Sequence, residues 1–246
     1  TNIVFGLFRE TKLVHQFRVE SSRGRTSDEY AVILRQLLAM HQIDPAQVRG
    51  AILASVVPPL TEPMVALAVK AFGIEPMVVG PGIRTGMALL VDTPREVGAD
   101  RIVNAVAAFE KVKGPVIVVD FGTATTFDVV DQGGNYIGGA IAPGIVLSVE
   151  ILHSATAMLP RIVVERPGRV IGKSTTEAMQ SGIFWGYVGL VEGMVRRISE
   201  EFGAPLDVVA TGGLAPLFHG NTPVITHLDP DITMRGLVEI YRRNRS

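Results

Sequence analysis

Apolar residues along this chain occur either in short runs or at intervals of three and four positions. The changes between these two patterns predict where strands and helices alternate. Short apolar runs typical of β-strands occupy 3–8, 13–18, 51–57, 76–79, 87–91, 116–120, 125–130, 137–141 and 207–210. Stretches that predict helices, several with apolar residues three and four positions apart, occupy 26–43, 58–71, 97–113, 145–154, 174–202 and 234–243. Strands that alternate with helices in this way predict an α/β fold.

A strand–turn–strand pattern occurs twice in the chain. It appears first over 3–18 and again over 116–130, and Gly114-Pro115 directly precedes the second copy. Glycine followed by proline commonly marks a loop between elements. We therefore expect two similar α/β domains, 1–114 and 115–246.

Composition and charge narrow the classes of function. The chain has 246 residues, of which 47% are apolar, so a well-filled core is available. A net charge of −1 gives no basic footprint for nucleic acid or an anionic membrane. Cysteine is absent from the sequence, which excludes disulfides and thiolate metal sites and agrees with a reducing compartment. No apolar run reaches the roughly 18 residues of a membrane-spanning helix, and no cleavable signal pattern is visible. We expect a cytoplasmic protein without nucleic-acid or membrane partners.

The strand 116–120 ends in a candidate binding loop. Asp120 lies where the strand stops, Gly122 permits a sharp turn, and Thr123 offers a hydroxyl and a backbone N–H. Ligands in α/β folds bind outside the carboxyl ends of strands, and inward-facing backbone amides bind phosphate. Asp120 is therefore a candidate for ion or phosphate binding, and Thr211-Gly212-Gly213 after a later strand is either a turn or a second place of close backbone approach.

A second candidate group precedes the loop. Gly98-Ala99-Asp100-Arg101 places a carboxylate and a guanidinium at the start of a predicted helix. An acidic residue in a first helical turn often only offsets the helix dipole, so position alone leaves a catalytic role for Asp100 open.

The segment 168–175 spells a near match to a phosphate-binding P-loop. Three residues separate its glycines where the P-loop motif has four, and no buried strand precedes it. Ser174 or Thr175, with Glu177, is better suited to capping the helix that follows. The five histidines show no spacing typical of metal ligands.

Taken together, these motifs resemble one family, the type III pantothenate kinases, within the superfamily of acetate and sugar kinases, chaperone ATPases and actin. The resemblance extends nearly end to end, with the motifs in the family's order. It rests on segments 94–101, 120–128, 138–144, 172–182 and 210–213. The resemblance implies two ribonuclease H-like domains with a nucleotide-binding cleft between them, as in actin-like ATPases.

The resemblance also implies an activity, the ATP-dependent phosphorylation of pantothenate at the first step of coenzyme A biosynthesis. Asp100 matches the family's general base. Gly98, Ala99, Asp100 and Arg101 match the segment that surrounds pantothenate, and Thr175 matches a further substrate contact.

For ATP, the resemblance implies contacts from two phosphate loops. Thr123 matches a contact in the second loop. The first loop of the family reads Asp-x-Gly-Asn-Thr, and Thr1 matches its end, with Asn2, Ile3 and Val4 following. We expect the rest of that loop to precede Thr1.

Cofactors and assembly follow from the same resemblance. Asp120 matches the ligand of a monovalent cation, K⁺ or NH₄⁺, and ATP is expected with Mg²⁺. Relatives are homodimers whose substrate site is completed at the interface, and the helix over 174–202 is a candidate interface. Val91 stands where relatives often carry a substrate-contacting tyrosine.

Two alternative functions remain open at this point. One is a phosphohydrolase of the polyphosphate type, which would release phosphate without pantothenate. The other is a non-catalytic regulatory or scaffold protein that retains the fold.

Overall fold

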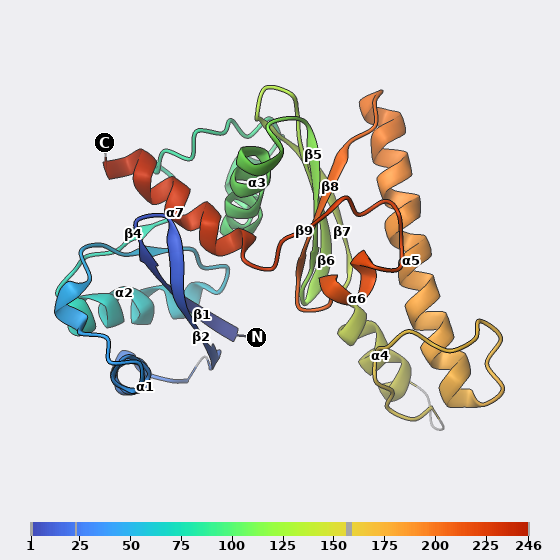
Figure 1. Cartoon of the computed structure of the whole chain (residues 1–246), viewed down its shortest axis with the longest axis horizontal. Helices are drawn as coiled ribbons and strands as arrows, with labels where there is room; N and C mark the ends of the chain where they lie inside the picture. The colour runs from blue at the N-terminus through green and yellow to red at the C-terminus, as the bar shows by residue number, and fades with distance from the viewer. Residues whose placement is uncertain (1, 23, 156–158, 246) are drawn as a thin grey trace. The chain divides into compact units, whose positions relative to one another are not determined.

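The computed structural model describes residues 2–22, 24–155 and 159–245, which divide into two compact units (Figure 1). Unit 1 comprises Thr1–Met87, Thr93–Ala107 and Thr233–Ser246, and unit 2 comprises Ala88–Asp92 and Ala108–Ile232. The expected ranges 1–114 and 115–246 differ from this grouping mainly at the C-terminus, which returns to unit 1. The boundaries of the two ribonuclease H-like domains stay a prediction.

Unit 2 is built on one five-stranded sheet. Its strands are β5 (Val116–Phe121), β6 (Ala124–Val130), β7 (Tyr136–Pro143), β8 (Asp207–Gly212) and β9 (His227–Leu228). They lie in the order β7-β6-β5-β8-β9. The first three form an antiparallel meander, whereas β8 is parallel to β5 and β9 is parallel to β8. β5 is therefore the central strand, and four of its six residues are the buried run Val116–Val119.

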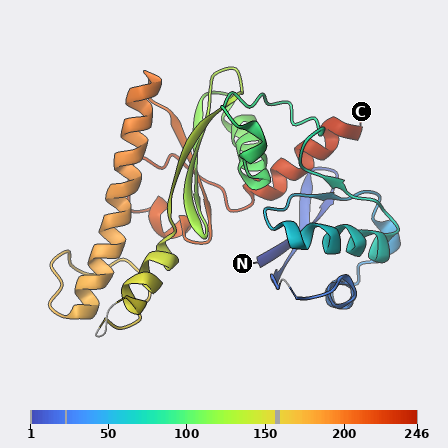
Figure 2. The same ribbon diagram turned by 180° about the vertical axis from the view of Figure 1, so that it is seen from behind.

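Helices cover one face of this sheet. They are α4 (Ile145–Ser154), α5 (Thr175–Phe202) and α6 (Ala215–His219), and both views place them on the same side of the sheet (Figures 1 and 2). Alternate residues of β5 and β6, such as Val119 and Phe127, point into this core and meet Ile145 and Phe184. The intervening residues Val116 and Val118 are also fully buried, so both faces of β5 are covered.

The β6–β7 hairpin closes through a side-chain network at Asp131. The Asn135 backbone N–H donates to Asp131 Oδ1 at 2.8 Å, and the Asn135 amide donates to Oδ2 at 3.0 Å. Burial raises the pKa of the Asp131 carboxyl, but these hydrogen bonds outweigh it and hold the pKa below its ordinary value. Gly134 in this turn has a φ of 77°, a left-handed conformation that glycine adopts without strain.

Unit 1 contains two separate two-stranded sheets within its described residues. β1 (Asn2–Arg9) pairs with β2 (Lys12–Glu20) antiparallel, as the hairpin pattern predicts, and β3 (Ile52–Leu53) pairs with β4 (Met77–Val78) in parallel. The helices of this unit are α1 (Ser27–Met40), α2 (Pro58–Phe72), most of α3 (Ala99–Val112) and α7 (Ile232–Arg245), with the short 3₁₀ helices η1 (Pro45–Gln47) and η2 (Pro94–Glu96).

α3 and α7 pack at very close range although most of the chain separates them. A Cβ at Gly236 would overlap the carbonyl oxygen of Val103, so only glycine permits this approach. Thr233 Oγ1 also donates to the buried Asn104 Oδ1 at 2.7 Å. Val103 and Ile240 are fully buried in the same cluster. The C-terminal helix is therefore part of the core of unit 1.

Two helix ends in unit 1 are capped in ways that their sequences favour. Thr26 and Glu29 form a reciprocal capping box at α1, and Gly73 ends α2 in the left-handed conformation with φ 69°. None of the described helices combines the length and apolar character needed to cross a bilayer.

Two strand predictions are wrong in extent. The run 51–57 forms only the two residues of β3, because Pro58 begins a helix directly afterwards. The run 87–91 makes only a single bridge, between Leu89 and Tyr136. Neither run is fully buried, since Val56 and Leu90 are exposed at 55% and 58%, and neither has a long strand partner among the described residues.

Candidate functional site

The carboxyl ends of β5 and β8 meet at one edge of the unit 2 sheet. Asp120 pairs in register with Thr211 of β8 and with Thr126 of β6. Because side chains in register lie on the same face of a sheet, the Asp120 carboxylate lies between two threonines. Asp120 is half-buried, whereas Thr211 is buried. This edge is where open α/β sheets bind ligands.

The Gly212 backbone lies in close contact with Asp120 and Phe121. It has a φ of 91°, and a Cβ there would lie 2.6 Å from Asp120 Oδ1 and 2.6 Å from the Phe121 carbonyl carbon. Any side chain at Gly212 would displace the carboxylate or the strand end. The sequence reasoning treated Thr211-Gly212-Gly213 as a turn or a ligand contact, and it did not find this packing role.

The Gly122–Thr123 turn lies at the same edge and is exposed. The Gly122 N–H donates to the Ala124 carbonyl at 3.1 Å, which closes the turn between β5 and β6. Gly144 packs directly on it, since a Cβ at Gly144 would overlap the Thr123 carbonyl and lie 2.8 Å from the Gly122 carbonyl oxygen. Gly144 is also the N-cap of α4, and no side chain caps that helix. The first N–H groups of α4 therefore begin beside the turn.

The second candidate group lies in unit 1, at the first turn of α3. Asp100 Oδ1 accepts a hydrogen bond from the Arg101 backbone N–H at 2.8 Å. A Cβ at Gly98 would lie 2.7 Å from that same oxygen and 3.4 Å from Val56. Gly98 thus leaves room for the half-buried Asp100 carboxylate to fold back over the helix start. Ala99 and Arg101 are half-buried on either side.

Thr175 is exposed at the first position of α5. The helix cap belongs to its neighbour, because Ser174 Oγ accepts from the Glu177 N–H at 3.2 Å. Glu177 in turn accepts from the Lys173 N–H at 2.7 Å. Capping by the 174–177 segment is confirmed, and it leaves the Thr175 hydroxyl outside the cap.

The expected residues of the first ATP loop fall in β1. Asn2, Ile3 and Val4 pair with Glu20, Val19 and Arg18 of β2. Thr1 lies outside the described residues. Their contact with ATP stays a prediction. Val91 belongs to unit 2, where its side chain lies 3.8 Å from the position of a Cβ on Gly138.

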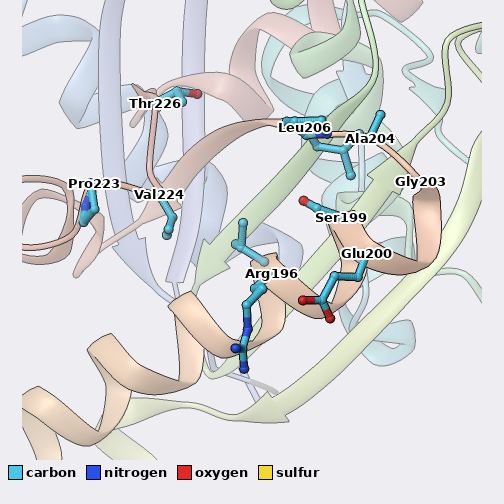
Figure 3. Close-up of a pocket in the computed structure, with 11 residues that line it drawn as sticks. Arg196, Ser199, Glu200, Gly203, Ala204, Leu206, Pro223, Val224 and Thr226 are labelled. Carbon is cyan, nitrogen blue, oxygen red and sulfur yellow. The ribbon is translucent and has the colours of Figure 1, made fainter.

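Among the described residues, the Asp120 edge contains no cluster of metal-binding side chains, and the pocket shown in Figure 3 lies elsewhere. Among the described residues, no group of three or more His, Cys, Asp or Glu side chains could hold a metal ion. A pocket of about 580 Å³ lies between the C-terminal turns of α5 and segments 203–206 and 223–226 (Figure 3). It adjoins the start of β8, the opposite end of the strand from Thr211.

Solved structures place the chain in a class by fold. A protein of Campylobacter jejuni assigned to the Baf family of transcriptional activators matches with a TM-score of 0.58 and 17% identity, over 94% of this chain and 91% of that one. A protein of Porphyromonas gingivalis assigned as an N-acetylglucosamine kinase matches with a TM-score of 0.50 and 13% identity, over 100% and 96% of the two chains. At these identities the likeness concerns the fold alone. The fold is that of the sugar kinases and actin-like ATPases, which confirms the expected α/β class.

Sequence comparison then gives the family. The sequence model of the type III pantothenate kinases matches residues 1–197. A curated relative from Paramagnetospirillum magneticum, named type III pantothenate kinase, is 56% identical over 99% of this chain and 94% of its own length. The chain belongs to the type III pantothenate kinase family, and the resemblance found in the sequence is confirmed.

Proposed function

We propose that this chain transfers the γ-phosphoryl group of ATP to the primary hydroxyl of pantothenate, releasing ADP and 4′-phosphopantothenate. The observation that carries the proposal is family membership along nearly the whole chain, with both motif groups formed as local structures. One is the Asp120 edge in unit 2, and the other is the Asp100 turn in unit 1.

The Gly122–Thr123 turn is the proposed contact for the ATP phosphates. It is exposed, it carries a hydroxyl and backbone amides, and the uncapped start of α4 adjoins it. Backbone N–H groups at a helix start and in a glycine turn attract anions. The predicted contacts of Thr1, Asn2, Ile3 and Val4 with the same triphosphate belong to this proposal.

Asp100 is the proposed general base. An alcohol has a pKa far above 7, so its proton leaves only as the new O–P bond forms and the bond to the ADP oxygen breaks. The carboxylate then needs correct position more than a raised pKa. The hydrogen bond from the Arg101 N–H to Asp100 Oδ1 and the space left by Gly98 support this role, because both restrict the carboxylate to one orientation. Arg101 suits the pantothenate carboxylate or the transferring phosphoryl group, because a guanidinium pairs with either anion. Thr175 is the proposed further substrate contact.

Two kinds of cation complete the proposed site. The fit of Asp120 to a cation rests on its half-buried carboxylate at the strand ends, with Thr126 and Thr211 hydroxyls in register beside it. Oxygen donors of this kind suit K⁺ or NH₄⁺. Mg²⁺ carried by ATP supplies charge neutralisation of the triphosphate, which agrees with the lack of a protein-built metal cluster among the described residues. A cytoplasmic location is part of the same proposal.

A homodimer is the proposed assembly, and α5 offers a surface for it. Its exposed side presents glycines at intervals of about one turn, namely Gly182, Gly186 and Gly189, and a Cβ at any of them would meet nothing within 4 Å. Nearby in sequence, α4 exposes Val146 and Ile151 at 53% and 51%. Glycine permits close helix approach, and exposed aliphatic side chains favour burial.

The decisive test measures pantothenate-dependent ADP release by the full-length protein, in K⁺ and then in Na⁺. We expect activity that requires pantothenate, prefers K⁺ and falls at least a hundredfold in Asp100→Asn, since the amide cannot accept the proton. Asp92→Asn, an exposed carboxylate outside both motifs, is the matched control.

Three results would contradict the proposal. ADP release indifferent to pantothenate would indicate a phosphohydrolase. No turnover by a folded full-length protein would favour the regulatory alternative. Full activity in Asp100→Asn would remove the residue from its role as base.

A further inference from the structure

The turn that carries Gly144 is anchored from behind by two hydroxyl groups. Tyr187 of α5 donates from its Oη to the Pro143 carbonyl at 2.8 Å. Ser148 of α4 lies 2.6 Å from the same Oη, and its Oγ also reaches the Gly144 carbonyl at 3.1 Å. The tyrosine ring is buried at 7% exposure in the core between the sheet and α5. The two hydroxyls therefore fix consecutive carbonyls of the 143–144 turn.

This anchored turn is in contact with the proposed phosphate-binding turn. Gly144 packs so tightly on the Gly122–Thr123 backbone that a methyl group has no room between them. The β6–β7 ladder ends at the pair Ala124 and Pro143, so no further strand pairing holds the two turns beyond that point. Beyond that point the Gly144 carbonyl accepts from the Ser148 backbone N–H at 2.9 Å and from Ser148 Oγ at 3.1 Å, and the Tyr187 hydroxyl holds the preceding Pro143 carbonyl.

We infer that Tyr187, with Ser148, is a positioning residue for nucleotide binding: its hydroxyl holds the Pro143–Gly144 turn and, through Gly144, the Gly122–Thr123 turn that contacts the ATP phosphates. The inference rests on the proposed function for the identity of the nucleotide. It gives a role to the 138–144 motif, which the proposed chemistry does not otherwise use.

The physical reason is rigidity at the phosphate contact. A turn that must present amides to a phosphate binds best when it is held in the bound geometry before the ligand arrives. Removing the Tyr187 hydroxyl leaves the ring and its packing in place, but it releases the Pro143 carbonyl and one partner of Ser148. The turns then sample other positions, and ordering them on binding costs free energy, which lowers the affinity for the nucleotide.

The test compares Tyr187→Phe with the wild type in pantothenate-dependent ADP release. We expect the KM for ATP to rise about five- to tenfold, the factor that corresponds to one hydrogen bond of ordinary strength, while the KM for pantothenate stays within twofold. Ser148→Ala should raise the KM for ATP less, and the double variant should cost less than the product of the two singles, because both act through one turn.

Tyr30→Phe is the matched control. Tyr30 is also a buried tyrosine whose Oη bonds to the backbone, accepting from the Ser22 N–H at 3.0 Å and donating to the Ser22 carbonyl at 3.2 Å, but it belongs to unit 1. A similar loss of thermal stability in both variants, with the KM for ATP raised only in Tyr187→Phe, supports the inference. Equal KM values in the two variants would overturn it.

A second readout does not depend on turnover. Amide hydrogen exchange without nucleotide should accelerate at 122–125 and 144–148 in Tyr187→Phe and stay unchanged at the same amides in Tyr30→Phe. Unchanged exchange there would overturn the anchoring itself. If exchange is faster in Tyr187→Phe but the wild type shows no pantothenate-dependent activity, the anchoring is supported and the proposed function is contradicted.

Discussion

Gly212 has only a hydrogen atom as its side chain, and this leaves the space that the Asp120 carboxylate occupies. Gly212 combines a left-handed φ of 91° with a backbone that touches both Asp120 and the end of β5. The sequence indicated Asp120, because an acid after a buried strand is typical of a binding edge. It could not indicate that Gly212 borders it, since the two are brought together by the parallel pairing of β5 and β8.

Gly212→Ala should therefore damage the site and the fold together. We expect a loss of about 2 kcal/mol of stability from the strained φ and the overlap with Phe121, and at least a tenfold loss of kcat/KM from the displaced carboxylate. Thermal unfolding and ADP release measure the two effects.

Gly220→Ala is the control for that substitution. Gly220 has a φ of −83°, and a Cβ there would meet nothing within 4 Å, so both quantities should stay near the wild type. If Gly212→Ala is as stable and active as the wild type, the Asp120 carboxylate and the end of β5 can move aside for a Cβ, and the expected packing role of Gly212 is wrong.

At the scale of the element, the long helices were predictable and the short strands were not. α2 and α5 carry local end signals, namely Gly73 after α2 and Ser174 before α5. β3 and β4 are two residues each and exist only because they pair with one another across a helix. Local patterns cannot set the length of a strand whose partner is distant, so the run 51–57 was assigned too long.

The cap of α1 offers a quantitative check at this scale. Thr26 Oγ1 accepts from the Glu29 N–H at 3.3 Å, and Glu29 Oε2 accepts from the Thr26 N–H at 2.7 Å. Thr26→Ala should cost about 1 kcal/mol in thermal or urea unfolding, whereas Thr26→Ser, which keeps the oxygen, should cost much less. Equal losses in the two variants would show that the methyl group, and not the cap, matters.

The same cap should depend on pH. The hydrogen bond from the Thr26 backbone lowers the pKa of Glu29 below its ordinary value. The carboxylate therefore contributes stability above the unfolded pKa, and that contribution is lost as the pH falls through the lower, folded value. Because the backbone N–H of residue 26 is also present in Thr26→Ala, the test uses Glu29→Ala, which removes the carboxylate, and its stability difference from the wild type should narrow below about pH 4.

At the scale of the whole molecule, the sequence predicted the fold family, and the boundaries 1–114 and 115–246 of its two domains stay a prediction. The motifs at 98–101 and 120–128 identified the family without any knowledge of tertiary contacts. The return of α7 to unit 1 was not predicted, because it depends on Gly236 fitting against Val103 far away in the sequence. The repeated strand–turn–strand pattern suggests two successive halves. That α7 packs in unit 1 is visible only from its tertiary contacts.

The proposed homodimer makes a prediction at the same scale. Gly186→Arg adds a long cationic side chain where the protomer has open space, so the protomer itself should keep its fold and gain helix propensity. If α5 packs against a second copy, light scattering should show the mass of one 26.4 kDa chain for the variant and twice that for the wild type.

Val32→Arg, on the exposed side of α1, is the matched substitution away from α5. It should leave the mass unchanged. A dimeric Gly186→Arg with wild-type affinity between copies would exclude this face of α5 as the interface.

The return of α7 to unit 1 also has a consequence for biosynthesis. A ribosome delivers the chain from the N-terminus, and unit 2, apart from its short segment 88–92, is one continuous stretch that is complete once Ile232 has emerged. The apolar side of α3, including Val103 and Val106, gains its cover of α7 only when α7 has emerged. Unit 1 therefore begins before unit 2 and is completed after it, so we expect its incomplete core to expose apolar surface during translation.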